Sequence, residues 1–542
     1  MKTSFAVWRL LIGMAVLGQV SVMQAQIAYI YTVTNNVAMI IRASGKGGAI
    51  VIPDTIDSWP VRIIGGSAFF RVGVTSVTIT NGVTTIQNNA FVQCSALTNV
   101  ILGSQVTNIE AAIVNRCTNL TDISVDPLNP FLSDVGGVLF DKKLETLLCY
   151  PGGLAPRYVV PNGVTSIARG AFSRLANLTN IVFPESLVSI GRNAFDFCSS
   201  LGSVSMPNNV RDIGDFAFAR CTSLTNVTLV NGITNIGNCA FVFCTNLTSI
   251  AIPEGLQSII GNEAFAFCTG LTNVSIDGGT KSIGNAAFWS CTSVTNISVP
   301  DSVTTIGSNA FEYCIGLTNI TIGSGVTKIG ANAFYWCPSL IGIEVSALNP
   351  VYRSDRGVLF KGVSSIIRYP NGLAGGYTIP DGVTNIDPYA FSDSSGLTSI
   401  TLPKSVTVIG ASAFEDCENL TSLYFTGSPP RADSTAFAYE TNSTVYYMPG
   451  SGNWGTSFDG LPAARWSLQA QNIAADFDPQ LHQFGFNING TTNLVVVIDC
   501  CTNLAHPDWR PIQTNVLTDG SMQFNDWQST NIPGRFYRLR SP

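Results

Sequence analysis

Apolar residues recur along most of this chain at a fixed spacing. Between Ile190 and Pro300 the sequence reads IGRNAFDFCSSLGSVSMP, IGDFAFARCTSLTNVTL, IGNCAFVFCTNLTSIAIP, IGNEAFAFCTGLTNVSI and IGNAAFWSCTSVTNISVP. The shared pattern, IGxxAFxxCxxLTxIxIPxxVT, has a period of 23 residues. A fixed period of this length is the signature of stacked-repeat proteins, in which each repeat packs only against its neighbours. The pattern therefore predicts an elongated array.

Within one repeat the hydrophobic positions predict three short elements. In LTSIAIP, Leu247, Ile250 and Ile252 face one way, which predicts a parallel strand. Pro253 ends that strand because proline cannot donate the next hydrogen bond of the ladder. A second extended piece, such as 303–306, is closed by Gly. The segment GxxAFxxC then predicts one short helical turn, whose Ala permits close stacking and whose Phe fills the core.

The 23-residue period is interrupted at two places, and each interruption predicts an insertion. At Leu128 and again at Leu348 the repeat gives way to a segment that begins LNP, contains GVLF and ends in Tyr-Pro. Each segment predicts a β-hairpin in place of the usual short turn. The repeat just before the first break is degenerate, with Ala112-Ile113 in place of Ala-Phe.

These patterns divide the chain into five parts. The array is expected to need a cap at each end, since an exposed apolar end would aggregate. Short strands separated by Asn-Gly, Asp-Gly and Pro-Gly signals near the C-terminus predict a small β-sandwich. The predicted boundaries are a signal peptide at 1–25, an N-terminal cap at 26–60, the repeat array at 61–424, a C-terminal cap at 425–466 and the β-sandwich at 467–542.

The first 25 residues have the parts of a secretory signal peptide. Lys2 and Arg9 precede the apolar run LLIGMAVLGQVSVM, which ends at a small-residue site. The alternative, a membrane anchor, needs about 20 apolar residues, and this run is shorter. Export therefore predicts a secreted or cell-surface protein with no membrane span after removal of the signal.

Charge argues against two classes of partner. Loss of Lys2 and Arg9 takes the net charge from −6 to about −8, because the signal segment has no acidic residue. An acidic chain is a poor ligand for nucleic acid or for an anionic membrane surface.

The chain has 14 cysteines, and most of them occupy one repeat position. The same slot holds Leu175 in one repeat and Ser394 in another, so it does not require sulfur. We expect buried free thiols that act as small hydrophobic groups, with inter-repeat disulfides as the alternative. A metal site is not expected, since no CxxC pair exists. The cysteines in the slot are Cys94, Cys117, Cys198, Cys221, Cys244, Cys268, Cys291, Cys314, Cys337 and Cys417.

The sequence gives little support for catalysis. The only histidines, His482 and His506, lie in the terminal domain without a neighbouring nucleophile motif. The acidic residues are scattered through predicted turns, where turn chemistry explains them. We therefore predict no enzyme, no catalytic residue and no cofactor.

Two surface stripes remain as candidate binding features. The first is a row of aromatic residues just before the Cys slot, interrupted by Arg220 and Ser290. These side chains either pack sideways on neighbouring turns or form a row of partner contacts. The candidate partner-binding residues are Phe197, Phe243, Phe267, Tyr313 and Trp336.

The second stripe is a ladder of hydroxyl and amide side chains on the strands. It either supports stacking of the strands or forms a broad binding surface, for instance for a glycan. Its members are Thr225, Asn226, Thr228, Thr248, Ser249, Thr272, Asn273, Ser275, Thr295, Asn296, Ser298, Thr318, Asn319 and Thr321.

The pattern IGxxAFxxCxxLTxIxIPxxVT, together with the GVLF hairpins, resembles the BspA-type leucine-rich repeat family of secreted and cell-surface proteins in bacteria and some protozoa. The resemblance covers residues 40 to about 466. It implies a mainly β fold, a curved parallel β-solenoid of leucine-rich repeats with two hairpin insertions. The segment from Pro533 to Leu539 resembles a short β-domain that follows such arrays in some exported bacterial proteins.

The resemblance also implies a class of function. Family members with assigned roles adhere to host or matrix proteins or to other cells, and the family has no fixed catalytic residues. We therefore expect a non-enzymatic scaffold for protein recognition or cell-surface adhesion. The alternatives are a glycan-binding module and a structural component of an envelope layer.

Overall fold

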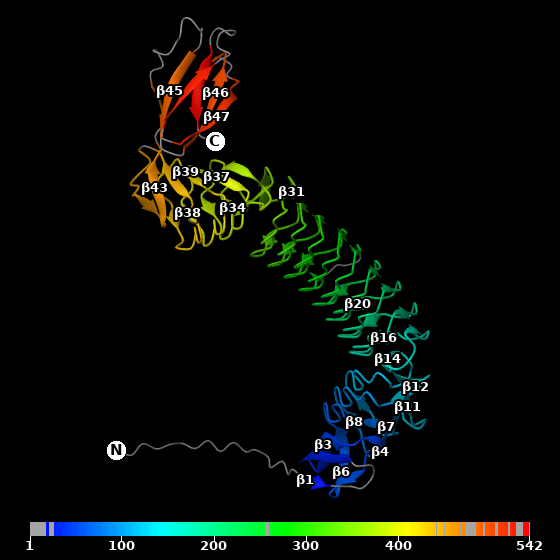
Figure 1. Ribbon diagram of the computed structural model, residues 1–542. Helices are drawn as coiled ribbons and strands as arrows, with labels where there is room; N and C mark the ends of the chain where they lie inside the picture. The colour runs from blue at the N-terminus through cyan, green and yellow to red at the C-terminus, as the bar shows by residue number, and fades with distance from the viewer. Residues whose placement is uncertain are drawn as a thin grey trace, which may run out of the picture. The chain divides into compact units, whose positions relative to one another are not determined.

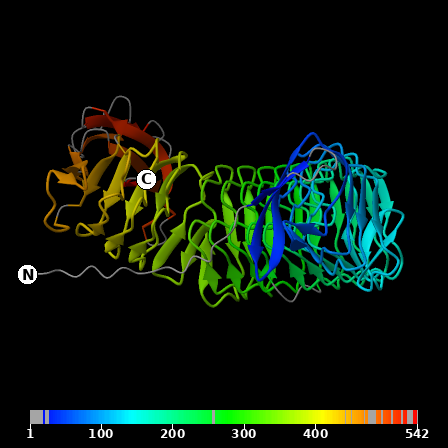
Figure 2. The same cartoon turned by 90° about the horizontal axis from the view of Figure 1, so that it is seen from below.

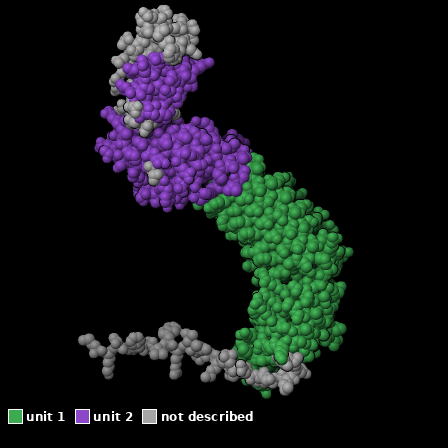
Figure 3. Space-filling model, viewed as in Figure 1, with its two compact units in different colours: residues 1–314, 328–334 green, residues 315–327, 335–542 purple. Residues whose placement is uncertain are grey.

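The computed structural model describes residues 18–20, 27–254, 259–440, 442–448, 450–466, 468–471, 484–490, 494–504, 508–518, 521–526 and 535–540. The chain forms two compact units (Figure 3). Unit 1 comprises residues 1–314 and 328–334, and unit 2 comprises residues 315–327 and 335–542. The predicted signal peptide lies outside the described residues, apart from Gly18–Val20.

Unit 1 is a stack of rungs, each of which contributes one longer strand and one two-residue strand (Figure 1, Figure 2). The longer strands are β4 (Gly48–Val51), β7 (Val74–Ile79), β9 (Asn99–Leu102), β11 (Asp122–Val125), β15 (Arg157–Val159), β17 (Asn180–Val182), β19 (Ser203–Ser205), β21 (Asn226–Thr228), β23 (Ser249–Ile252), β25 (Asn273–Ile276) and β27 (Asn296–Val299). The short strands are β8 (Thr85–Ile86), β10 (Asn108–Ile109), β16 (Ser166–Ile167), β18 (Ser189–Ile190), β20 (Asp212–Ile213), β22 (Asn235–Ile236), β24 (Ile259–Ile260), β26 (Ser282–Ile283), β28 (Thr305–Ile306) and β30 (Lys328–Ile329).

The pairing between rungs is parallel and in register. β16 to β30 follow one another in a single sheet, so that Ile190 pairs with Ile213 and Ile213 with Ile236. The identical register follows from the fixed 23-residue period, because each residue meets its own repeat equivalent in the next rung.

The rungs of unit 2 follow the same plan. The longer strands are β29 (Asn319–Ile322), β31 (Gly342–Val345), β35 (Gly375–Thr378), β37 (Leu397–Leu402), β39 (Ser422–Phe425), β41 (Thr444–Tyr447) and β43 (Leu461–Arg465). The short strands are β36 (Asn385–Ile386), β38 (Val408–Ile409) and β40 (Arg431–Ala432). β42 (Ser457–Phe458) instead pairs antiparallel with β43.

A stack of phenylalanine rings forms the centre of the core. From Phe172 to Phe334 successive rings in unit 1 are stacked with centroids 4.8 to 5.8 Å apart. The Ala before each Phe is buried, which lets neighbouring backbones approach. Phe391, Phe414 and Phe437 form an equivalent stack in unit 2. The predicted role of Phe as the core residue of each rung is confirmed.

The predicted helical turn is wrong, and the described residues contain no helix. The segment from Gly to Cys in each rung, which we call the AF turn, instead alternates the direction of its backbone hydrogen bonds. In the AF turn 191–198, the N–H groups of Asn193, Phe195 and Phe197 donate to carbonyls of the next rung. The intervening N–H groups donate within the turn to the residue three positions earlier. A helix would use every N–H locally, whereas this arrangement couples each rung to the next.

In the structure, the core positions of the degenerate third repeat lie one residue later than the sequence pattern suggests. Phe91 N–H donates to the carbonyl of Ile113, the bond that Phe195 makes to Ala217 in a regular rung. Ile113 therefore occupies the Ala position and Val114 the Phe position. Cys117 then lies three residues after the core position, as in the other repeats.

Both insertions are hairpins, as predicted. The first consists of β12 (Leu132–Val135), β13 (Val138–Asp141) and β14 (Thr146–Cys149), and the second of β32 (Tyr352–Asp355), β33 (Val358–Lys361) and β34 (Ser365–Arg368). The tyrosine of each Tyr-Pro pair takes the Phe position of its rung. Tyr150 stacks on Phe172 at 5.1 Å, and Tyr369 stacks on Phe391 at 5.1 Å.

An antiparallel hairpin covers the first rungs of unit 1. It is formed by β2 (Ile27–Thr34) and β3 (Val37–Gly45), with β1 (Gly18–Val20) on its outer edge. β3 then pairs in parallel with β6 (Trp59–Ile64), which is flanked by β5 (Thr55–Ile56). The hairpin thereby joins the sheet of short strands.

The C-terminal strands form a small β-sandwich of two antiparallel sheets. One sheet has β44 (Leu468–Gln471), β45 (Phe484–Gly490) and β48 (Ser521–Asp526), and the other has β47 (Arg510–Leu517), β46 (Leu494–Cys501) and β49 (Phe536–Arg540). Their buried apolar residues form one cluster with Tyr424 and Tyr446 of the last rungs.

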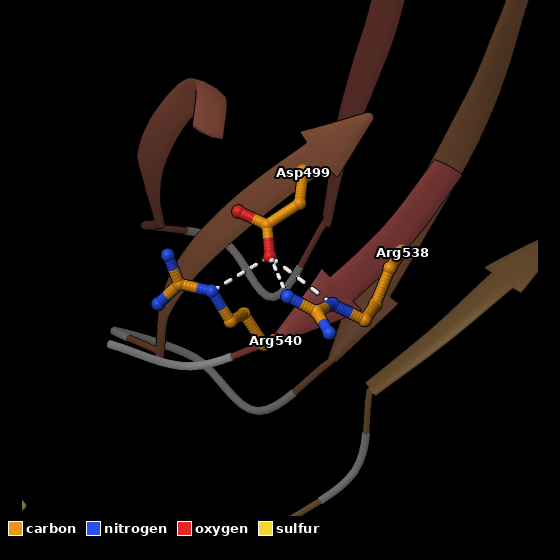
Figure 4. A network of polar contacts seen from close by, with 3 residues as sticks. All are labelled: Asp499, Arg538 and Arg540. Carbon is orange, nitrogen blue, oxygen red and sulfur yellow. Dashed lines mark hydrogen bonds and ion pairs between the residues drawn. The ribbon is translucent and has the colours of Figure 1, made fainter. Parts of the chain in front are cut away.

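One buried carboxylate of this sandwich is held by two arginines (Figure 4). Asp499 on β46 is 1% exposed and accepts hydrogen bonds from Arg538 at 2.6 Å and Arg540 at 2.8 Å. Burial acts to raise the pKa of this carboxyl, but the bonds from Arg540 and Arg538 outweigh burial and lower the pKa below its usual value. The cluster therefore ties β49 to β46.

Candidate functional site

The predicted aromatic residues all occupy the same place in the AF turn. Each lies directly before the Cys slot and has a left-handed backbone, with φ between 54° and 60°. Phe197, Phe243, Phe267 and Tyr313 belong to unit 1, and Trp336 belongs to unit 2. In unit 1 we call this row the aromatic column, which comprises Arg174, Phe197, Arg220, Phe243, Phe267, Ser290 and Tyr313.

Part of the column is stacked. The rings of Phe243 and Phe267 are parallel, with centroids 4.4 Å apart. Phe197 lies between two guanidinium groups, with Arg174 4.2 Å and Arg220 4.8 Å from the ring centroid. Where Ser290 interrupts the row, Trp289 packs against Phe267 at 4.7 Å. The sideways packing considered from the sequence is therefore present in this part of the column.

The aromatic side chains also reach solvent. Phe243 is 37% exposed, Tyr313 39% and Trp336 38%, while Phe197 and Phe267 are half-buried. Stacking thus covers part of these side chains and leaves another part accessible.

A buried carboxylate organises the cationic end of the column. Asp196 lies next to Phe197 in the chain and forms an ion pair with Arg220 at 3.3 Å. Burial raises the pKa of the Asp196 carboxyl, against the opposing charges of Arg220 and Arg174. The pair holds Arg220 over Phe197.

The hydroxyl ladder takes part in stacking the strands. Thr225 Oγ1 donates to the carbonyl of Gly202 at 3.0 Å, Thr248 Oγ1 to Thr225 at 3.1 Å, and Thr272 Oγ1 to Thr248 at 3.1 Å. Each hydroxyl therefore satisfies a backbone carbonyl of the preceding rung. Amide side chains such as those of Asn226 and Asn273 remain exposed.

The cysteines of the slot are buried and unoxidised in the structure. Most of these thiols donate to the carbonyl of the Phe one rung earlier, as Cys244 does to Phe218 at 3.2 Å. Burial raises the pKa of the Cys244 thiol to about 12. Such a thiol is a poor nucleophile and a poor metal ligand, because both roles need the thiolate.

Other candidate chemistry is sparse in the described part of the chain. His482 and His506 lie outside the described residues. No set of three or more His, Cys, Asp or Glu side chains that could hold a metal ion occurs among the residues that are described. Across those same residues, no helix has the length and apolar character needed to cross a bilayer.

Sequence reasoning missed the cations of this surface. It treated Arg220 as an interruption and did not single out Arg174 or Arg116, which occupy the same AF-turn position. Repeat alignment could have grouped them, but their proximity depends on an inserted hairpin that brings distant repeats together.

The family assignment follows from the repeat itself. The model of the BspA type leucine rich repeat region matches six times, over residues 49–142, 156–259, 258–350 and 375–454. The chain belongs to the BspA-type leucine-rich repeat family. The matches include the stacked Phe rungs, the Cys slot and the whole aromatic column.

Solved leucine-rich repeat proteins resemble this BspA-type chain. One from Bacteroides ovatus is 21% identical, with 79% of this chain and 100% of that chain covered and a TM-score of 0.42. One from Eubacterium ventriosum is 22% identical, with coverage of 54% and 93% and a TM-score of 0.41. A leucine rich cell surface protein from Faecalibacterium prausnitzii is 22% identical, with coverage of 80% and 89% and a TM-score of 0.30. Among curated proteins none matches this chain.

Proposed function

We propose that this protein is an exported, non-enzymatic recognition scaffold that binds a protein partner through the aromatic column. The observation that carries the proposal is the placement of large aromatic residues at left-handed backbone positions where they stay partly exposed. The partner would be a protein of another cell, of a host matrix or of the envelope.

The left-handed backbone conformation at these positions makes the presence of aromatic residues there informative. A left-handed conformation costs a non-glycine residue about 1–2 kcal/mol, and Asn or Gly would adopt it more readily. The chain instead places Phe243, Phe267 and Tyr313 there. Aromatic and arginine side chains dominate the energetics of protein interfaces, so Arg174 and Arg220 beside Phe197 strengthen the case.

Export is part of the proposal. The apolar run between Arg9 and Ala25 supports a cleaved signal peptide, and the BspA-type repeat supports a surface location. Burial of the slot thiols is compatible with an oxidising environment, because a thiol that no oxidant reaches stays reduced.

The experiment compares partner capture by the full mature chain and by a double variant, Phe243→Asn with Tyr313→Asn. Asparagine tolerates the left-handed backbone, so the variant removes the aromatic edges while the turn is kept. Proteins retained from matrix and envelope extracts are identified, purified and titrated one by one. We expect at least about tenfold weaker binding of a true partner to the variant.

The matched control is Asp416→Asn, which changes the same left-handed AF-turn position in unit 2, outside the aromatic column. It should bind as the unmodified chain does. A partner that binds the double variant with unchanged affinity would refute the column as the binding site.

A further inference from the structure

The first insertion removes one AF turn from the stack in unit 1. As a result, AF turn 110–117 lies against AF turn 168–175, a contact that we call the seam. A Cβ atom at Gly170 would be 3.1 Å from the Cβ of Ala112. Gly170 also has φ of +68°, so glycine suits this position for both reasons.

The backbone ladder is interrupted at the seam. In a regular rung, the N–H groups equivalent to Ala112, Val114 and Arg116 donate to the next AF turn. At the seam these N–H groups have no acceptor within the described chain. On the other wall the carbonyls of Arg169 and Ser173 have no donor among the described residues. The seam therefore leaves hydrogen-bonding groups available to a ligand.

Three adjoining hollows lie along the seam. Their volumes are about 350, 340 and 180 Å³. The smallest is lined by polar side chains that include Asn89, Asn115, Arg169, Arg174, Asn193 and Asp196. Cavities of a few hundred Å³ with convergent polar groups match sites for small ligands.

The charge of the seam is positive. Arg116, Arg169 and Arg174 form no ion pair within the described residues, although each lines at least one hollow. Burial and the neighbouring charge of Arg116 lower the pKa of the Arg174 guanidinium, as expected where cations crowd together.

The nearby carboxylates have other partners. Glu110 accepts a hydrogen bond from the Asn88 N–H at 3.0 Å, and Asp196 pairs with Arg220 at 3.3 Å. None of the three arginines forms an ion pair with either carboxylate, although the charge of Asp196 acts on Arg174.

The second insertion shows how the same chain fills the equivalent place. There Arg368 is 5% exposed and donates to the carbonyl of Tyr389 at 2.6 Å and to Ser392 Oγ at 3.0 Å. Asn371 also contacts Arg368, and the ring of Tyr335 lies 5.8 Å from its guanidinium carbon.

The first insertion keeps one of these side chains, since Ser173 corresponds to Ser392, but it lacks the arginine, the asparagine and the two tyrosines. The registers β13 to β14 and β33 to β34 equate Cys149 with Arg368, and the positions that follow equate Gly152 with Asn371. Tyr335 and Tyr389 correspond by repeat position to Asn115 and Gly170, and Asp393 corresponds to Arg174. In the second insertion the buried guanidinium of Arg368 occupies this place. In the first insertion the place is a hollow lined by Arg169 and Arg174.

We propose that the seam binds a sugar that carries a carboxylate or a sulfate group. Arg169 and Arg174 would hold the anionic group, since guanidinium forms paired hydrogen bonds with planar or tetrahedral oxyanions. The amides of Asn89, Asn115 and Asn193 would meet the ring hydroxyls. A compact hollow that is lined by amide side chains suits a saccharide better than an acidic peptide, because a peptide binds in an extended groove.

The test is calorimetric titration of the full chain at constant low ionic strength with glucuronate, glucose, sodium sulfate and a short Asp/Glu peptide. We expect saturable binding of glucuronate at one site, competition by sulfate and no binding of glucose. Arg169→Gln and Arg174→Gln should each weaken glucuronate binding by about tenfold or more. Arg211→Gln is the matched control, because Arg211 is exposed and donates only to nearby carbonyls away from the seam.

A filling variant completes the test. Cys149→Arg copies the second insertion and should abolish glucuronate binding without removal of any seam arginine, with folding checked by circular dichroism. Equal binding of glucose and glucuronate, or unchanged binding by Arg169→Gln, overturns the proposal. Binding of the acidic peptide in the absence of glucuronate binding also overturns it, in favour of a peptide site.

Discussion

At the residue scale, cysteine suits the Cys slot because its side chain has a long C–S bond and low polarity. The thiol of Cys244 is fully buried and still contacts the Phe218 carbonyl at 3.2 Å, because the long C–S bond spans the gap between rungs. Ser394 occupies the same slot, and its buried hydroxyl has no partner among the described residues. A thiol loses little when it is weakly bonded, whereas a hydroxyl loses its hydration.

This difference predicts an order for two substitutions. Cys244→Ala should lower the free energy of unfolding by about 1 kcal/mol through loss of packing. Cys244→Ser should lower it by about 2–3 kcal/mol, because a buried hydroxyl is left poorly bonded. Urea denaturation of both variants measures the order, and a more stable Ser variant would contradict it.

Glu440 takes the Cys slot of the last Phe rung, where it is 9% exposed. Burial raises the pKa of its carboxyl from 4.5 to about 7, despite a hydrogen bond from Ser443. The folded state therefore binds the proton more tightly than the unfolded state. Stability should fall as pH rises from about 4.5 to about 7 and remain low above that.

Glu440→Gln is expected to remove this pH dependence. At pH 8 the variant should be more stable than the unmodified chain by on the order of 1–2 kcal/mol, because no charge is buried. The comparison is a series of urea denaturations from pH 4.5 to 8. The exposed Glu344→Gln serves as control and should leave the pH profile unchanged, because Glu344 does not contribute to the raised pKa of Glu440.

At the element scale, one asparagine anchors each inserted hairpin. Asn129 is fully buried, and its amide donates to the carbonyls of Gly103 at 3.0 Å and Val106 at 2.9 Å. Its side-chain oxygen accepts from the N–H groups of Phe131 and Leu132, both at 2.9 Å. Asn349 makes the equivalent four bonds in unit 2. The hairpins are thus fixed by an asparagine just before their first strand and not only by strand pairing.

Loss of that anchor should loosen the first hairpin. We expect Asn129→Ala to cost about 2–4 kcal/mol, since four hydrogen bonds of about 1 kcal/mol each are broken. Hydrogen exchange should accelerate at β12 and β13 while the rungs around Phe241 stay protected. Uniform acceleration through unit 1, or none, would count against a local anchor.

At the scale of the whole molecule, the repeats act as a one-dimensional series of neighbours. The backbone N–H and carbonyl groups of each rung form hydrogen bonds with the rung before it and the rung after it. Contacts between rungs that are not neighbours therefore contribute little to stability. A change that preserves the period should therefore be tolerated, and one that breaks the period should not.

Removal of residues 262–284 tests this property in unit 1. The deletion takes out one 23-residue period and joins Gly261 to Asn285, which restores the IGxxAF pattern. We expect a folded chain with an unchanged β spectrum by circular dichroism and a melting temperature within a few degrees of the original. Removal of residues 262–273 breaks the register and should unfold the neighbouring rungs.

The repeat pattern was enough to predict the fold class and the core residues of each rung. A fixed period makes every rung repeat the same contacts, so Phe stacking, the hairpin insertions and the terminal sandwich could be predicted from residue patterns alone. The helical turn was predicted wrongly, because GxxAFxxC is compatible with local hydrogen bonds to the same extent as with bonds to the next rung. Only the stacked neighbour supplies the acceptors that decide between them.

Tertiary structure alone decided what the surface can do. The left-handed backbone conformation at Phe243 and Tyr313 could not be predicted from these residue types. A Phe or Tyr within a hydrophobic pattern predicts a buried side chain, whereas these two are partly exposed. The seam joins residues about 60 positions apart in the chain, and it exists because an insertion removes the turn that would separate them. Both surfaces depend on contacts between repeats, and a periodic sequence describes each repeat without showing which repeats are in contact across an insertion.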